Sequence, residues 1–522
     1  MKRNSIVFTI IIFLTLTFTI NSQQQVKIPW TTIADSPWPT LRGDMQGTGR
    51  SEYIGPRTNN VIWKKDMPLG VIYGPLIGYD DNLYMGSRSL TSQIGVNYFY
   101  SVHKNGDDFW TFTTETYYPN NVGPILGNDS TIFFGSRNSK IYALDFFGNE
   151  KWNVTGLPIG VQNFTISRDK FGNFYIPITD TIVIISYDGS SVRKIPWPGI
   201  YLRGIMFSPS GDTMYFKDEN RQFGSAGALK STDLEGNINW SFNPGIINWG
   251  LPLIDNQNNI YVLGRDTLLG ENFLFAVSPS GNLKWKYSIT GYNKLTAPTI
   301  DKNGNIIFHA FVNGNREYQT AIISLDYYGN ENWTTILDFE NDTYQNWIDH
   351  ELVSDAEGKV YFGTSVASYF GCIDSDGTIL WTLDMGDLEY DSCPAIGSDG
   401  TLYIGAHISS LFPYHTQNLI AVKDSPNSVS DYQFLKEYNL LQNYPNPFNP
   451  TTNIQYAIGI RQFMTLKVYD VLGKEIATLV NEEKSAGNYE VEFNASHLSS
   501  GIYYYQLRSG DFVETKKMIF LK

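Results

Sequence analysis

Asp326-Tyr-Tyr-Gly-Asn-Glu-Asn-Trp333 is a tight turn followed by the start of a strand, and close variants of it recur along the chain. The variants end at Trp152, Trp240 and Trp381. A glycine-centred turn supplies the positive φ that a hairpin needs, and Asp or Asn side chains cap it. The stretch therefore predicts a hairpin with tryptophan at a fixed place on its second strand.

The tryptophan itself is the mark of a longer repeat, with a period of about 45 residues. Its copies, which we expect to have a structural role in the blades, are Trp63, Trp110, Trp152, Trp197, Trp240, Trp285, Trp333 and Trp381. A second glycine turn recurs in each period, as in Asp301-Lys-Asn-Gly-Asn305, between short apolar strands such as Leu402-Tyr-Ile-Gly405. Four short strands per period without helical periodicity predict the blade of a β-propeller.

The ring closure can be predicted from an offset between two counts. Eight first strands begin near Gly74, Gly123, Phe164, Gly204, Gly250, Thr296, His350 and Cys393. Eight strands carry tryptophan, but the one at Trp63 precedes the first full blade, and the last blade, 393–423, lacks one. We therefore expect residues 59–66 to supply the outer strand of the last blade, which removes an open sheet edge. The alternative, an open solenoid, needs distinct capping repeats, which the sequence lacks.

Both ends of the chain differ from the repeat. Residues 1–22 have a basic head, an apolar run and a polar exit, which predicts a secretory signal peptide. An uncleaved anchor helix is the alternative, but the apolar run is shorter than the ~20 residues that a span needs. Residues 23–37 are an N-terminal extension, 38–425 the propeller, and 426–434 a linker rich in Ser, Pro and Asn. Alternating strands with glycine turns predict a small β-sandwich for 435–522. The fold class is all-β: an eight-bladed propeller followed by a small C-terminal sandwich.

Composition excludes several classes of function. A net charge of −14 argues against binding to nucleic acid or an anionic membrane. Two cysteines, Cys372 and Cys393, exclude a four-thiolate zinc site and leave open whether they form a disulfide. His407 and His415 share a loop without a third metal ligand. After the leader no stretch is long and apolar enough to span a bilayer. We expect no metal and no cofactor.

The repeat of Leu-Tyr-x-Gly, Ala-Leu-Asp, Gly-Asn and Trp resembles the tryptophan-docking repeat of the quinoprotein (PQQ-like) propellers. The segment from Trp38 to Ser51 resembles the opening segment of bacterial members. The resemblance implies an eight-bladed ring with indoles stacked between blades. Dehydrogenases of this family share an adjacent cysteine pair over the quinone and a calcium held by Glu, Asn and Asp. This chain has no adjacent cysteines, and we expect it not to bind PQQ.

The tail is similar to the C-terminal sorting domain of the type IX (Por) secretion system. Four blocks match in order: Asn443-Tyr-Pro-Asn-Pro-Phe-Asn-Pro450, Val468-Tyr-Asp-Val-Leu-Gly473, Leu498-Ser-Ser-Gly-Ile-Tyr503 and Lys516-Lys-Met518. The similarity implies the type IX machinery as a partner, passage through the periplasm, and a secreted or outer-membrane surface location. The alternative is a generic fibronectin-like accessory sandwich.

Long connections predict where a ligand binds. In a four-stranded blade, the connections between blades and those between second and third strands open on one face, which we call the loop face. Binding sites usually lie on long loops of a rigid scaffold, and aromatic rings beside Asp and Asn suit a sugar chain or a peptide. The candidate ligand-binding residues on these loops are Tyr117, Trp249, Tyr292, Trp347, Tyr390, Arg88, Arg137 and Arg265. The alternative is that the aromatic residues only cover the joints between blades.

No catalytic constellation is visible in the sequence. It has neither a Gly-x-Ser-x-Gly elbow nor a Walker loop, and its repeated Asp turns lack the acidic twelfth position of a calcium loop. We expect a non-catalytic secreted or surface propeller that binds a glycan or a protein partner. The alternatives are an extracytoplasmic quinoprotein-like or other enzyme, and a structural envelope scaffold. The export tail counts against a scaffold that stays in the periplasm.

Overall fold

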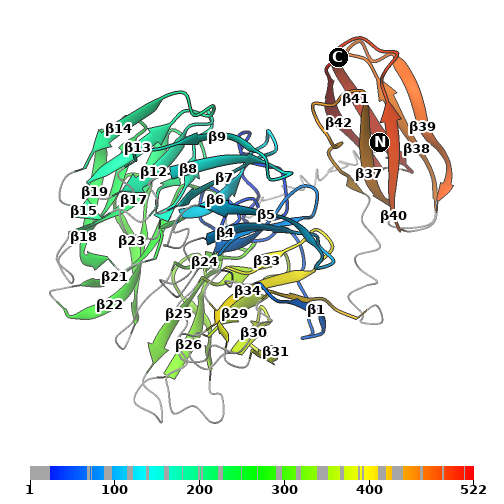
Figure 1. Cartoon of the computed structure of the whole chain (residues 1–522). Helices are drawn as coiled ribbons and strands as arrows, with labels where there is room; N and C mark the ends of the chain where they lie inside the picture. The colour runs from blue at the N-terminus through cyan, green and yellow to red at the C-terminus, as the bar shows by residue number, and fades with distance from the viewer. Residues whose placement is uncertain are drawn as a thin grey trace, which may run out of the picture.

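The structure is a computed structural model. It describes residues 24–67, 71, 73–87, 97–114, 122–136, 140–157, 164–178, 180–197, 200–201, 204–220, 227–247, 250–266, 269–289, 297–312, 319–337, 351–364, 369–385, 388–390, 393–408, 419–425, 439–458, 462–484, 487–510 and 512–522. The regular elements within these ranges are all strands. They form a ring of blades and, as a second body, a smaller sandwich (Figure 1).

The ring consists of eight blades, each with four antiparallel strands; β10 (Phe164–Thr165), in the connection between the second and third blades, pairs in addition parallel with the first strand of the second blade. The first four blades are β2 (Tyr73–Ile77) to β3 (Leu83–Gly86), β4 (Asn97–Val102) and β5 (Asp108–Thr114); β6 (Val122–Leu126) to β7 (Thr131–Ser136), β8 (Lys140–Asp145) and β9 (Glu150–Val154); β11 (Ser167–Arg168) to β12 (Phe174–Ile178), β13 (Thr181–Ile185) and β14 (Val192–Pro196); and β16 (Met206–Phe207) to β17 (Thr213–Asn220), β18 (Gly227–Asp233) and β19 (Ile238–Ile247).

The next three blades are β20 (Leu253–Ile254) to β21 (Ile260–Asp266), β22 (Glu271–Val277) and β23 (Leu283–Ile289); β24 (Thr299–Ile300) to β25 (Ile306–Val312), β26 (Gln319–Leu325) and β27 (Glu331–Ile336); and β28 (Val353–Ser354) to β29 (Val360–Gly363), β30 (Tyr369–Ile373) and β31 (Ile379–Asp384). The eighth contains β33 (Ala395–Ile396), β34 (Leu402–Ile408) and β35 (Leu419–Val422), and its fourth strand comes from the other end of the chain.

That fourth strand is β1 (Val61–Lys65), which pairs antiparallel with β35, so that Trp63 lies opposite Ala421. The predicted closure of the ring by residues 59–66 is confirmed. The strand that precedes the first blade in the sequence thus completes the sheet of the last blade, which leaves the eighth blade no shorter than its neighbours.

Burial along the strands follows from the stacking of blades. Second strands such as β7 and β29 are buried at every residue, because neighbouring blades cover both of their faces. Outer strands such as β27 alternate between exposed and half-buried residues. The continuous apolar runs and the alternating runs of the sequence therefore mark inner and outer positions in the same blade.

The joints between blades are made by the repeated tryptophan. In six of the eight cases the indole lies over the glycine of the third-to-fourth-strand turn in the next blade, where a Cβ would come within 2.7–3.2 Å of the ring. The six pairs with this contact are Trp63–Gly106, Trp110–Gly148, Trp152–Gly189, Trp240–Gly281, Trp285–Gly329 and Trp333–Gly377. In five of the six the indole N–H also donates to the carbonyl two residues before that glycine, at 2.8–3.2 Å.

Two tryptophans depart from this pattern. Trp381 reaches the eighth blade, whose fourth strand comes from the N-terminal part of the chain, and its indole donates to the Pro56 carbonyl at 3.2 Å. Trp197 does not lie over Gly236, because Ile195 occupies that position, with its Cγ2 2.6 Å from where a Cβ on Gly236 would stand. The ring of Trp197 instead packs edge-on against Phe216, with centroids 5.1 Å apart.

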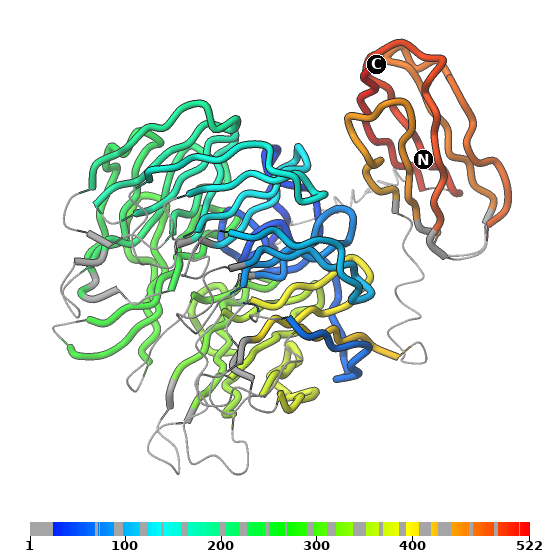
Figure 2. Tube along the Cα trace, viewed as in Figure 1, coloured from blue at the N-terminus to red at the C-terminus, as the bar shows by residue number. Residues whose placement is uncertain are grey.

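Residues 30–58, which we call the strap, bind to the inner strand of every blade from the first to the seventh (blue in Figure 2). Each bond involves the last residue of an inner strand: Ile77 N–H to Trp38 O, Leu126 N–H to Pro39 O, Trp30 Nε1–H to Arg168 O, Phe207 N–H to Met45 O, Ile254 N–H to Gln46 O, Ile300 N–H to Thr48 O and Ser354 N–H to Gly49 O. Asp424, just after β35, accepts the amides of Arg57 and Thr58 and so links the eighth blade.

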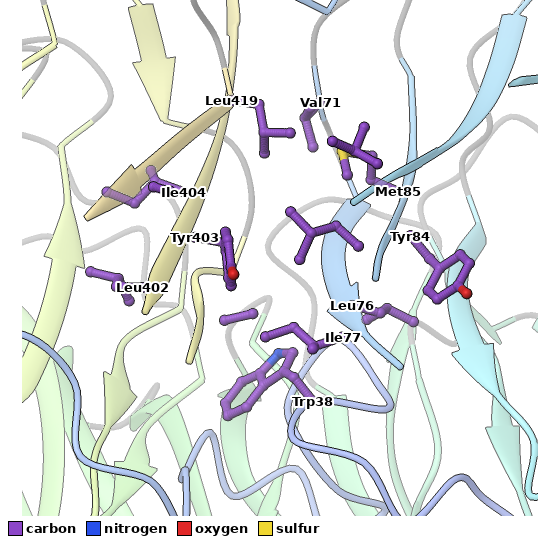
Figure 3. Packing of buried hydrophobic residues seen from close by; sticks show 14 of the residues in the cluster. Trp38, Val71, Leu76, Ile77, Tyr84, Met85, Leu402, Tyr403, Ile404 and Leu419 are labelled. Atoms are coloured by element: carbon purple, nitrogen blue, oxygen red, sulfur yellow. The ribbon is translucent and has the colours of Figure 1, made fainter. Parts of the chain in front are cut away.

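The strap lies at the ends of the inner strands, where the first-to-second-strand turns begin. This face, opposite to the loop face, is the turn face. Trp38 is fully buried there beside Ile77, in the cluster that also holds Tyr403 of the last blade (Figure 3). Gly49 has φ +62°, and a Cβ on it would stand 3.0 Å from both Leu352 O and Thr299 Oγ1, so this close approach requires glycine.

The C-terminal sandwich has two sheets. One contains β36 (Asn439–Leu440), β37 (Thr451–Ile458) and β40 (Gly487–Asn494), and the other contains β39 (Glu475–Lys484), β38 (Gln462–Tyr469), β41 (Gly501–Ser509) and β42 (Phe512–Phe520) in that order. Phe448, Leu466, Tyr505 and Met518 are among the residues of its core. The domain thus has a hydrophobic core of its own.

Candidate binding site on the ring

The structure describes two of the eight predicted ligand-binding residues. Tyr117, Trp249, Tyr292, Trp347, Arg88 and Arg137 lie outside the described residues. Arg265 lies on β21 in the fifth blade, half-buried, with its Nε donating to Gly270 O at 3.3 Å. Tyr390 lies in β32 (Leu388–Tyr390) opposite Ala406 of the eighth blade. The two residues therefore belong to different blades and do not form one site together.

The connections between blades contribute strands at the loop face. β15 (Ile200–Tyr201) pairs with the end of β17 at Asn220 and Glu219, and β32 pairs with the end of β34. The last residues of β19, Ile246 and Ile247, pair in the same way with Arg265 and Gly264 of the fifth blade. These connections pair alongside the loop-face end of the second strand of the next blade and so hold backbone in a fixed register at the loop face.

Arg42 is a charged side chain among the inner strands, which surround the central channel of a propeller. Only 2% of it is exposed. Its Nε donates to Gly47 O at 2.9 Å, and its Nη2 donates to Pro298 O, just before β24, at 2.5 Å. Its Nη1 is buried without a hydrogen-bond partner among the described residues and lies 3.5 Å from Glu351 Oε1. The strap thus places a guanidinium beside a carboxylate near the start of the inner strand β28.

Glu351 is the accessible member of this group, with 26% of its side chain exposed. Its Oε2 accepts a hydrogen bond from the Cys393 thiol at 3.1 Å. Burial, with the Glu351 carboxylate as the next cause, holds the pKa of Cys393 well above its usual range. A nucleophilic cysteine must be a thiolate, so Cys393 stays a neutral donor at physiological pH. Glu351 can accept hydrogen bonds from hydroxyl or ammonium groups of a ligand.

In the part of the chain that the structure describes, no three His, Cys, Asp or Glu side chains converge. The repeated Asp residues act within their own turns. Asp301 Oδ1, for example, accepts the amides of Asn303 and Asn305 at 2.8 and 2.9 Å. Cys372 and Cys393 are both buried free thiols. No described helix is long and apolar enough to cross a membrane.

Arg42 and Glu351 are residues that sequence reasoning missed. Arg42 lies within the segment that resembles the opening of quinoprotein propellers, but its partners Pro298 and Glu351 are more than 250 positions away. Glu351 lies two residues before the inner strand β28, as Cys393 lies two residues before β33, and this shared position is the sequence signal that could have paired them.

The model of the secretion system C-terminal sorting domain matches residues 442–521. The match covers the sandwich and indicates export by a type IX secretion system, with the secretion machinery as a partner and a cell-surface or secreted location. Among curated proteins, none matches this sequence.

Solved structures with a similar arrangement share little sequence with this chain. BamB from Moraxella catarrhalis is 15% identical, with a TM-score of 0.48 over 70% of this chain and 98% of BamB. Hydrazine synthase of Kuenenia stuttgartiensis is 14% identical, with a TM-score of 0.43 over 57% of this chain and 93% of that one. Virginiamycin B lyase from Staphylococcus aureus is 14% identical, with a TM-score of 0.41 over 58% and 94%. The strand pairing described above defines the ring, and none of these likenesses transfers an activity to it.

Proposed function

We propose that the propeller, residues 38–425, binds an extracellular ligand at its loop face without turning it over. The ligand is a glycan or a protein partner with hydroxyl or ammonium groups. The mature protein acts at the cell surface or in the medium, where the sorting domain delivers it.

The observation that carries this proposal is the strap. It is bonded to the turn-face ends of the inner strands of seven blades, so the turn face is occupied by the chain's own residues. The opposite face keeps the longer connections, and binding sites usually lie on such loops of a rigid scaffold. A ligand that approaches the centre of the ring therefore does so from the loop face.

Two further features support a polar ligand. Glu351 offers a partly exposed carboxylate near the start of an inner strand, backed by Arg42. The predicted loop residues Trp249 and Trp347 would add aromatic faces, each worth about 1 kcal/mol in a stacked contact. The combination of a carboxylate acceptor and flat apolar rings is suited to sugars and peptides.

A glycan array and a panel of surface proteins, probed with the mature protein, test the proposal directly. Replacing both Trp249 and Trp347 with Ala should weaken binding about tenfold or more. Glu351→Gln should also weaken binding, but it should lower the melting temperature as well, because the buried Arg42 loses its ion-pair partner. Trp240→Ala is the matched control, because this tryptophan is a joint residue and should cost stability instead. If the Trp249/Trp347 variant loses melting temperature while affinity is unchanged, these aromatic residues cover joints and the loop-face site is wrong.

Export is tested separately by removing residues 435–522. The ring should fold and remain in the periplasm, because its core and its closure include no residue of the tail. Appearance of the shortened chain outside the cell at the normal level would overturn the role of the tail.

A further inference from the structure

The sorting domain contains a copy of the turn that joins the blades of the ring. Asp470-Val-Leu-Gly-Lys474 connects β38 to β39. Asp470 Oδ1 accepts the amides of Leu472 and Lys474, both at 2.9 Å, and Gly473 N–H donates to Asp470 O at 3.0 Å. We call residues 470–474 the tail turn.

The turn at Asp145 in the ring has the same bonds. Asp145 Oδ1 accepts the amides of Phe147 and Asn149 at 2.9 Å, and Gly148 N–H donates to Asp145 O at 3.0 Å. The two glycines have φ values of +85° and +80°, for Gly148 and Gly473 respectively. The backbone of the tail turn therefore presents the same surface as a blade turn.

In the ring this surface is a docking platform. Six glycines of this kind carry a tryptophan ring from the preceding blade. The residue two positions before the glycine is exposed at some of these turns, such as Tyr187 at 59%, and buried at others, where Phe146 and Tyr327 are 1% and 8% exposed. Its carbonyl accepts the indole N–H of that tryptophan.

In the sandwich the same platform is vacant. No atom of the described residues lies within 4 Å of the position that a Cβ on Gly473 would take. Val471, which corresponds to Phe146, is 64% exposed, and Leu472 is 90% exposed, more than any other large apolar residue that the structure describes. The turn does not require this apolar pair, because the ring builds the same turn with Leu234 and Glu235. Leu472 is more exposed than Phe147 and Tyr328, at 59% and 63%, which hold the same position in turns of the ring, so the tail turn presents the more exposed apolar tip.

We propose that the tail turn is a docking platform for an aromatic side chain of a protein in the type IX export machinery. Gly473 would lie under the ring, the Val471 carbonyl would accept its N–H or O–H donor, and Leu472 would pack at its side. A protein fits better than a lipid surface, because the tip has only two apolar residues and the charged Asp470 and Lys474 flank them.

Two substitutions remove the platform while keeping the turn. Leu472→Glu copies the residue that the ring has at Glu235. Gly473→Asn keeps the positive φ, which Asn tolerates, but places a side chain where the partner ring would lie. The matched control is Val513→Glu, which replaces an exposed apolar residue on β42 of the same sandwich.

The experiment follows the full chain in a bacterium with a working type IX system and measures its amounts outside the cell and in the periplasm. Leu472→Glu and Gly473→Asn should each lower export about tenfold, as expected for loss of a central contact, with unchanged melting temperatures. Val513→Glu should be exported normally. Normal export of both turn variants would overturn the proposal.

A cross-linking measurement keeps the test independent of folding defects. A photo-reactive benzoylphenylalanine in place of Leu472 should form an adduct with a type IX protein during export, at a site with a surface aromatic residue. Adducts with lipid alone, or with no export component, would overturn the proposal.

Discussion

Seven of the eight joints of the ring are made by a tryptophan, six of them with the indole over a turn glycine, whereas the joint between the third and fourth blades is made by an arginine. In the six, a flat ring covers the turn glycine, and most of these indoles also donate to the turn carbonyl. At the joint between the third and fourth blades, Arg193 Nη2 donates to Leu234 O at 3.4 Å, and Nη1 forms an ion pair with Glu235. Ile195 covers the glycine in place of an indole.

The difference teaches that the turn, and not the tryptophan, defines the joint. In the regular blades the tryptophan follows the turn glycine by four residues, as Trp240 follows Gly236. Arg193 follows Gly189 by the same four residues and donates to the equivalent carbonyl. One residue supplies both the apolar cover and the donor in the regular joints, while Ile195 and Arg193 divide these roles here.

The largest expected effect comes from removing the strap, which is hydrogen-bonded to every blade. Deleting residues 24–58 from the mature chain takes away the bonds to all eight blades and the Pro56 carbonyl that Trp381 uses. The cooperative unfolding transition should be lost or weakened by more than about 5 kcal/mol, most of the stability of a typical domain. Denaturant unfolding measures this, with a chain lacking residues 439–522 as the control. An unchanged transition would show that the joints alone hold the ring.

At a regular joint, Trp240→Ala should lower the free energy of unfolding by about 3 kcal/mol, because it removes a large ring from over Gly281 together with a 2.8 Å hydrogen bond. Chemical denaturation followed by far-ultraviolet circular dichroism measures the loss. A change below about 1 kcal/mol would contradict the role of the indole in the joint.

The third joint can be converted to the regular kind. Arg193→Trp together with Ile195→Thr copies the pair Trp333 and Thr335, which lies over Gly377. The double variant should gain about 1 kcal/mol, because a buried aromatic contact replaces a solvent-exposed ion pair. Destabilisation of the double variant would mean that the fourth blade is shaped specifically for Ile195.

The smallest effect is expected for Arg193→Ala. Both partners of the ion pair are exposed, Arg193 at 43% and Glu235 at 67% of their side chains. The loss should be about 0.5 kcal/mol and should shrink further in high salt, since such pairs are screened. A loss as large as that of Trp240→Ala would contradict the division of roles between Arg193 and Ile195.

The sequence was sufficient for the parts of the fold that repeat locally. The number of blades and the closing strand follow from turn glycines and apolar runs that lie within each period. Residue type alone predicts a structural role for Trp197 like that of the other seven tryptophans, although it follows Gly189 by eight residues and not four. The number of residues after the turn glycine predicts which side chain lies at the joint, and the type of residue does not.

The contacts of the strap could not be predicted in this way. Arg42 meets Pro298 across 256 positions, and a single sequence contains no periodic signal for such a pairing. The same limit applies to the candidate site. Arg265 lies on the second strand of the fifth blade, whereas Tyr390 lies on a connecting strand that pairs with the second strand of the eighth blade. The remaining six predicted binding residues stay predictions.

The strap also has a consequence for the lifetime of the protein outside the cell. In an open array of repeats, a terminal unit can unfold alone, since it contacts only its neighbours. Here one continuous segment is hydrogen-bonded to the inner strand of seven blades and to the end of the eighth, so no blade can separate before the strap does. Proteases cut chains that have opened, at rates set by the population of the open form. Coupling eight blades to one segment makes partial opening as costly as global opening, which protects an exported protein where no chaperone can refold it.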